Sequence, residues 1–171
     1  MATAISSKVD VACPYCKTYG QTTHSFHEIA RTPRFGRIIY TCVAKATDYS
    51  NTSAIASHIK IALDKDGHMP WTWVFDCNDL KMKHTVHLDV AMTLGKLLRD
   101  KYAESLFMIM IINPTSGIDT IITRVLPILS SDAMKYTRKC KGSPLEIYCA
   151  LQKEGIEEAG LMAIMGEIRS N

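Results

Sequence analysis

The chain has 171 residues, and its 20 Lys and Arg against 17 Asp and Glu give a formal net charge of +3 at pH 7. This length is typical of a single domain whose core needs no disulfide bonds, and a composition of 47% hydrophobic and 22% charged residues excludes a disordered or collagen-like chain. So small an excess of cations, without a zinc-finger, RNA-recognition or helix-turn-helix signature, argues against nucleic acid as a partner.

Residues 1–32 read as a short polar N-terminal appendage. Residues 1–7 have neither the cationic nor the apolar stretch of a secretory signal, so we expect a cytoplasmic protein with reduced cysteines. Cys13, Cys16, His24 and His27 then form two pairs with chelate spacing. Two thiolates and two imidazoles are the ligands of tetrahedral zinc. The appendage is therefore a candidate zinc knuckle; the alternative is a disordered tail in which the four residues do not meet.

The segment Cys13-Pro14-Tyr15-Cys16 is also similar to the active-site motif of glutaredoxins. In those proteins the first thiolate is activated at the N-terminus of a helix. Residues 17–23, with a glycine and several threonines, are a poor start for such a helix. Thiol-disulfide exchange through Cys13 and Cys16 is therefore the weaker alternative.

Strand-like and helix-like stretches alternate along residues 33–171. Residues 37–44 and 71–75 are rich in β-branched and aromatic residues and predict strands, and residues 106–112 are apolar on both faces, which is typical of a parallel strand. Helical periodicity predicts helices over residues 53–63, 85–102, 118–129, 144–153 and 156–168. This order predicts an α/β domain with a mostly parallel sheet flanked by helices.

Apolar side chains recur at spacings that place them on common surfaces. The residues concerned are Trp71, Trp73 and Phe75 on one strand, Phe107, Ile109 and Ile111 on another, and Ile118, Ile121, Ile122, Val125 and Leu129 on a helix. These surfaces could pack solidly or enclose an apolar cavity. The longest uncharged stretch, residues 105–118, is too short to span a membrane, which takes about 20 residues.

A basic cluster follows the last of these apolar stripes and consists of Lys135, Arg138, Lys139 and Lys141. Such a cluster could bind an anionic membrane surface, which would make the protein peripheral on membranes. The alternative is a solvated basic turn.

Four short motifs occur in order at residues 73–81, 101–106, 111–114 and 125–129. They include a strand that ends in Asp76 and a second strand that ends in Asn113-Pro114. The last motif is a Pro-x-Leu segment, Pro127 to Leu129, at the end of the helix that follows. Over residues 36–154 the chain resembles the CRAL-TRIO lipid-binding domain. The resemblance implies a sheet with helices on one face and, on the other, an apolar cavity covered by a gate helix.

The residues and the resemblance together leave three hypotheses. The first is non-enzymatic binding of a lipid or other hydrophobic small molecule between the sheet and the gate helix. The second is an adaptor on the same fold that binds a protein partner instead. The third is the dithiol oxidoreductase. No P-loop, G-x-G-x-x-G or G-x-S-x-G motif is present, and we do not expect an enzyme.

Overall fold

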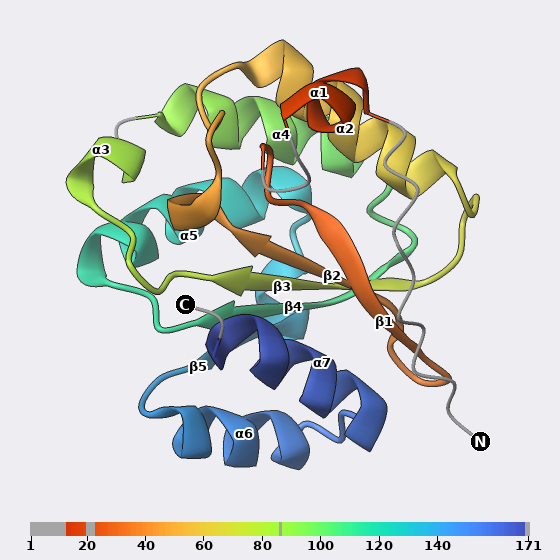
Figure 1. Cartoon of the computed structure of the whole chain (residues 1–171), viewed down its shortest axis with the longest axis vertical. Helices are drawn as coiled ribbons and strands as arrows, with labels where there is room; N and C mark the ends of the chain where they lie inside the picture. Colours follow the sequence, from red (N-terminus) through yellow and green to blue (C-terminus); the bar gives the residue numbers. More distant parts are fainter. Residues whose placement is uncertain (1–12, 20–22, 86, 170–171) are drawn as a thin grey trace.

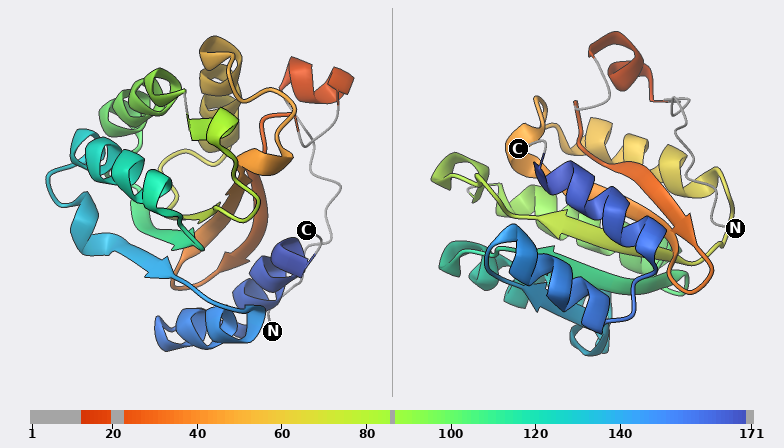
Figure 2. Two further views of the ribbon diagram at one scale, coloured as in Figure 1. Left: turned by 90° about the vertical axis from the view of Figure 1, so that its left-hand side faces the viewer. Right: turned by 60° about the horizontal axis from the view of Figure 1, so that its bottom comes forward.

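The structure is a computed structural model that describes residues 13–19, 23–85 and 87–169. The expectation about residues 1–7 lies outside the described residues. A five-stranded sheet is covered by helices on both faces, which confirms the expected α/β class (Figures 1 and 2).

The sheet has the strand order β1-β2-β3-β4-β5. The strands are β1 (His27–Thr32), β2 (Gly36–Cys42), β3 (Trp71–Asp76), β4 (Leu106–Ile112) and β5 (Thr137–Cys140). Strand β1 is antiparallel to β2, and every later neighbour is parallel. Strand β1 belongs to the stretch that the sequence suggested was an appendage, so the sheet begins before residue 33.

Helices α2, α4 and α5 lie on one face of the sheet, and α6 and α7 on the other (Figure 2). The helices are α1 (Pro14–Tyr19), α2 (Thr52–Asp64), α3 (Met82–Thr85), α4 (Leu88–Lys101), α5 (Ser116–Leu129), α6 (Pro144–Lys153) and α7 (Glu158–Arg169), with short 3-10 turns at Val43–Lys45 and Ala133–Tyr136. Among the described residues, no helix is both long and apolar enough to cross a membrane.

Two hydrophobic clusters fill the two sides of the sheet. The first joins Trp71, Ile109 and Ile111 of the sheet to residues of α2, α4 and α5. The second joins Tyr40, Val74 and other strand residues to α6 and α7. Strand β4 contributes to both clusters, as expected of a parallel strand with helices on each side.

A bulge in β4 corrects one expectation about the apolar surfaces. Trp71 pairs with Leu106, and the next residue, Thr72, pairs with Met108, so Phe107 is an extra residue between them. Phe107 is 41% exposed, and its ring packs edge-on against Phe35 in the second cluster. The expectation that Phe107 shares a face with Ile109 and Ile111 is therefore wrong.

Candidate functional site

An apolar cavity of about 190 Å³ lies between the sheet and helices α2, α4 and α5. Its walls come from strands β2 to β4 and from all three helices, and nearly all of the atoms that face it are apolar. The lining includes nine of the eleven residues expected at a ligand site: Trp73, Phe75, Ile109, Ile111, Ile118, Ile121, Ile122, Val125 and Leu129.

The two expected residues that do not line the cavity are Trp71 and Phe107. Trp71 is 1% exposed and belongs to the hydrophobic cluster beneath the cavity, with its ring centroid 6.1 Å from that of Trp73. Trp73 in turn lies 5.8 Å from Phe75. The three aromatic residues therefore do share one face of β3, as alternation along a strand predicts.

Polar side chains line the cavity near the carboxyl ends of β2 and β3. They include Thr41 at the end of β2, Tyr49 in the loop that follows, and His84 and His87 beyond β3. The Tyr49 ring lies 4.9 Å from that of His84 and 5.6 Å from that of His87. All three rings are half-buried, so this polar group reaches the protein surface. The carboxyl edge of a parallel sheet is where α/β proteins usually bind ligands.

His84 is held in its neutral form. Burial, together with the nearby cations Lys83 and Lys81, lowers its pKa from the ordinary value of 6.5. Its Nδ1 accepts a hydrogen bond of 2.9 Å from the backbone N–H of Lys81, so the proton of the neutral ring is on Nε2. His84 and Tyr49 were not expected at the site, because neither belongs to a periodic apolar stripe.

Helix α5 covers the cavity in the position that the resemblance gives to a gate helix. It begins at an N-cap, Thr115, whose side chain accepts a hydrogen bond from Ile118 N. Its first turn carries Asp119, whose carboxylate lies 2.9 Å from Lys139 Nζ and 3.7 Å from Lys141 Nζ. These ion pairs tie the start of the helix to β5 and the residue that follows it.

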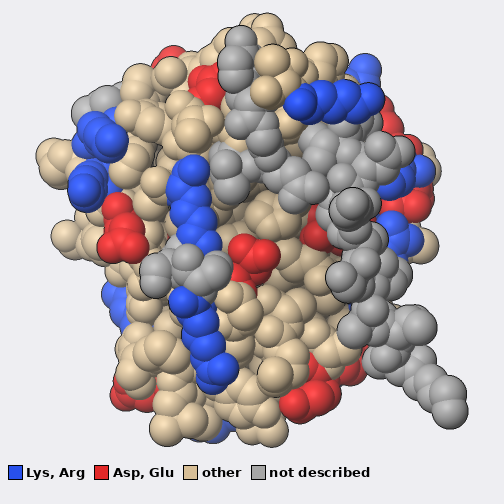
Figure 3. All heavy atoms as spheres, viewed as in Figure 1, with Lys and Arg blue, Asp and Glu red and all other residues tan. Residues whose placement is uncertain are grey.

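The basic cluster is thus largely paired with carboxylates. Besides the two lysines at Asp119, Arg138 Nε lies 3.0 Å from Glu154 and Lys135 Nζ lies 2.7 Å from Asp132. On the face seen in Figure 3, Lys and Arg side chains are likewise interspersed with Asp and Glu. The four cations therefore offer an anionic membrane much less net charge than their sequence suggests.

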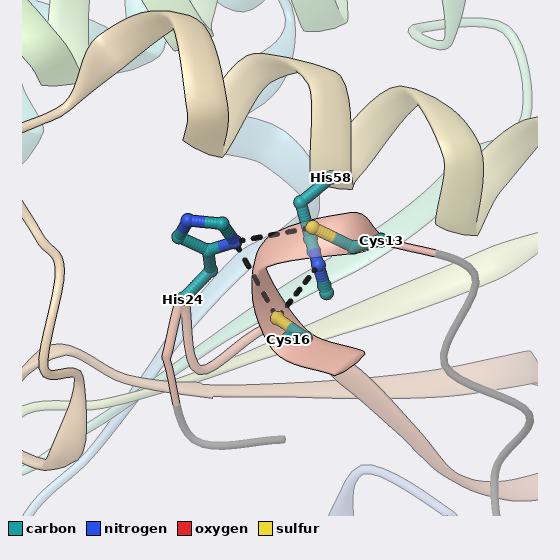
Figure 4. Close-up of side chains that lie close together, drawn as sticks. All are labelled: Cys13, Cys16, His24 and His58. Carbon is teal, nitrogen blue, oxygen red and sulfur yellow. Dashed lines mark hydrogen bonds between the residues drawn. The ribbon is translucent and has the colours of Figure 1, made fainter. Parts of the chain in front are cut away.

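A second constellation gathers three of the four expected metal ligands. Cys13, Cys16 and His24 are buried together with His58 of helix α2, and their ligand atoms all lie within 4.8 Å of one another (Figure 4). His27 is not a member: it lies on β1, where its Nε2 is 3.4 Å from Glu167 of α7. The expectation of His27 is corrected to His58, which no sequence spacing could reveal because it comes from a separate helix.

Both thiols of this cluster are 2% exposed, and burial raises the pKa of Cys16 to about 11. A dithiol oxidoreductase needs an accessible thiolate of lowered pKa, and helix α1, at six residues, provides little macrodipole to lower it. The arrangement therefore favours metal binding over thiol-disulfide exchange. Two cysteines and two histidines could hold a metal ion here.

Comparison with known proteins bears on the domain as a whole. The family model of the CRAL/TRIO domain matches residues 34–154. Among solved structures, the crystal structure of Sfh5 is similar to 73% of this chain, with a TM-score of 0.51 and 9% sequence identity. The match covers 56% of that chain, so this one spans about half the length of its solved relative. No curated protein matches the sequence.

Proposed function

The chain belongs to the CRAL/TRIO domain family, whose members generally bind or transfer lipids, and from this premise we propose that it holds a lipid or other hydrophobic small molecule in the cavity. The function is binding or transfer, without a catalysed reaction. The observation that supports the proposal most directly is the apolar cavity between the sheet and α5, in which the expected aromatic and aliphatic residues meet.

The composition of the cavity suits a ligand with an apolar body and a polar end. Burial of hydrocarbon against the aliphatic and aromatic walls contributes about 25 cal/mol per Å² of apolar surface. The neutral His84 and its neighbour Tyr49 can hydrogen-bond to a polar head group where the cavity meets the surface. Such a ligand would lie with its tail over β3 and β4 and its head at the carboxyl ends of β2 and β3.

The size of the cavity is consistent with a closed position of α5 as the proposed lid. An apolar cavity of about 150 Å³ holds a molecule of the size of benzene, whereas ligand pockets commonly measure about 300–1,000 Å³. At about 190 Å³ the cavity holds part of an acyl chain. Entry of a whole lipid therefore requires α5 to move away from the sheet.

Lipid extraction from the purified chain, followed by mass spectrometry, tests the proposal. We expect a co-purifying lipid in the wild type and its loss in Ala91→Phe, because Ala91 of α4 lines the cavity and a phenyl ring would fill it. Thr93→Phe is the matched control, since Thr93 is exposed on the same helix. If Ala91→Phe does not fold, Ile121→Phe introduces a ring from the lid.

The contrary result is equally clear. Wild-type chain that repeatedly carries no lipid, and that takes up no fluorescent fatty acid, would contradict the proposal and favour the adaptor that binds a protein. Retention of the lipid in folded Ala91→Phe and Ile121→Phe would show that the cavity is not the binding site.

A further inference from the structure

We infer that Cys13, Cys16, His24 and His58 bind one zinc ion, which fastens the N-terminal segment to helix α2. The inference rests on the geometry of this cluster and does not depend on lipid binding. Cys16 Sγ lies 3.3 Å from His58 Nδ1 and 3.5 Å from His24 Nδ1, and Cys13 Sγ lies 3.7 Å from His24 Nδ1. Zinc bonds of about 2.3 Å to sulfur and 2.0–2.1 Å to nitrogen place such atoms about 3.5 Å apart in a tetrahedron. The three distances bracket that value.

The outer nitrogen of each histidine faces an oxygen atom, and that of His58 is hydrogen-bonded. His58 Nε2 lies 2.6 Å from the carbonyl oxygen of Phe26. A carbonyl can only accept, so Nε2 carries the proton and Nδ1 presents its lone pair to the cysteines. His24 Nε2 lies 3.6 Å from the carboxylate of Asp48, too far for a hydrogen bond, but the negative charge there favours the same tautomer. A carbonyl or carboxylate behind the imidazole is the usual outer shell of a zinc ligand.

Hydrogen bonds among the four side chains account for only two of the three short S···N contacts. The neutral imidazoles offer only acceptors at Nδ1, each with one lone pair in the plane of the ring. The two thiols have one proton each, so they can form at most two S–H···N bonds across the three S···N contacts. A cation replaces both protons and is bound by all four atoms.

Charge and burial favour the same conclusion. The four residues are between 2% and 7% exposed, and a divalent cation with two thiolates is neutral, so the assembled site can be buried at little electrostatic cost. Two sulfur and two nitrogen ligands in a tetrahedron are typical of zinc. With all four positions taken by protein, the site is structural and leaves no position for a substrate.

Helix α1 has little hydrophobic packing of its own to stabilise it. It has six residues and lies on the outer side of α2, away from the sheet (Figures 1 and 2). Among the described residues, neither hydrophobic cluster includes a side chain of α1, and Tyr15 is 46% exposed. Cys13 and Cys16 are the buried positions of this segment. A structural zinc ion supplies the folding free energy that so short a helix lacks.

Metal analysis of the full chain, purified under reducing conditions without chelator, tests the site. We expect one zinc ion per chain by native mass spectrometry and elemental analysis. Cys16→Ser and His58→Gln should abolish this zinc. His27→Gln and Cys149→Ser are the matched controls and should keep it, since His27 lies on β1 and Cys149 is exposed. Asp48→Ala, which leaves every ligand in place, should lower zinc affinity about 10- to 100-fold.

Cobalt substitution keeps the test decisive if a ligand variant fails to fold. Wild-type chain loaded with Co²⁺ should show the visible absorption of tetrahedral cobalt together with a sulfur-to-metal charge-transfer band. Wild-type chain that carries no zinc and acquires neither band would overturn the inference. Loss of zinc in His27→Gln with retention in His58→Gln would overturn this ligand set.

Discussion

Asn113 joins the ends of three strands at the edge of the sheet where helix α5 starts. Its backbone N–H donates to Cys140 O, at the end of β5. Its side-chain amide donates to Asn78 Oδ1 at 2.9 Å and to Gly142 O at 3.2 Å, and its Oδ1 accepts from Gly142 N at 2.9 Å. The residue does this with a φ of 49°, a left-handed conformation that asparagine tolerates better than most residues. Asn113 therefore fastens together the strand ends from which the chain leads into α5.

Two substitutions at Asn113 separate its hydrogen bonds from its backbone conformation. Both Asn113→Ala and Asn113→Gly remove the side-chain bonds, each of which contributes about 0.5–1.5 kcal/mol. Alanine also incurs about 1–2 kcal/mol in the left-handed region, whereas glycine costs about 0.4–1 kcal/mol through the entropy of the unfolded chain. Urea unfolding should thus find both variants less stable than wild type, with alanine the lower by about 0.5–1 kcal/mol. Equal stabilities would refute the conformational part of this account.

Individual residues show which positions could be predicted from the sequence and which could not. Trp73 and Phe75 were placed correctly because alternation along a strand is a local property. Phe107 was misplaced because a bulge depends on pairing with β3, which the sequence of β4 does not encode. Cys13, Cys16 and His24 were found from their spacing, but the fourth member of the cluster, His58, is brought to them by the packing of α2.

At the scale of elements, helix α5, the proposed lid, is held at its N-terminal end by ion pairs at the surface. Lys139, followed by Lys141, lowers the pKa of Asp119 below its ordinary value of 3.8. A carboxylate with a lowered pKa contributes its stabilisation above that ordinary value and loses it as the pH falls through the folded-state pKa. The tether is therefore intact throughout the neutral range and is weakened by salt rather than by mild acid.

Asp119→Asn should speed the exchange of bound lipid. Exposed pairs contribute about 0.2–1 kcal/mol, which corresponds to about a 1.5- to 5-fold faster release. Stopped-flow transfer of a fluorescent fatty acid to vesicles measures this rate, and the wild type should approach the variant at high salt. Asp132→Asn, which breaks the Lys135 pair outside α5, is the control and should leave the rate unchanged. A rate in Asp119→Asn equal to that of wild type would show that these pairs do not hold the lid.

Some helices and strands could be predicted from the sequence more accurately than others. The helix predicted over residues 144–153 begins and ends where α6 does, because Ser143 caps it and Pro144 opens it. Strand β1 was missed because it is an edge strand with the sequence HEIART, whose burial alternates little. Strand β5 was not predicted, because its basic residues suggested a membrane-binding cluster or a solvated turn, whereas the strand forms by pairing with β4.

In the whole molecule, the candidate zinc site and the cavity share a wall. His24 is a proposed zinc ligand and also lines the cavity, as does Phe26, whose carbonyl oxygen accepts the hydrogen bond from His58. Ile55 and Ile59, on the helix that carries His58, line the cavity as well. A metal ion that fixes these segments therefore fixes the cavity wall and should stabilise its ligand-bound form.

Because the two sites share a wall, we expect the binding of zinc and the binding of a fatty acid to affect each other. If zinc raises the affinity for a fatty acid by some factor, the fatty acid must raise the affinity for zinc by the same factor. We expect a factor of about 5 or more, typical of coupled sites. Competition with a chromophoric chelator, with and without saturating fatty acid, gives the zinc affinity, and fluorescence titration of apo and zinc-loaded chain gives the lipid affinity. Ala91→Phe, with its cavity filled, should bind zinc equally well with or without fatty acid. Zinc affinity in the wild type that is indifferent to fatty acid would show that the two sites act independently, although each could still bind its own ligand.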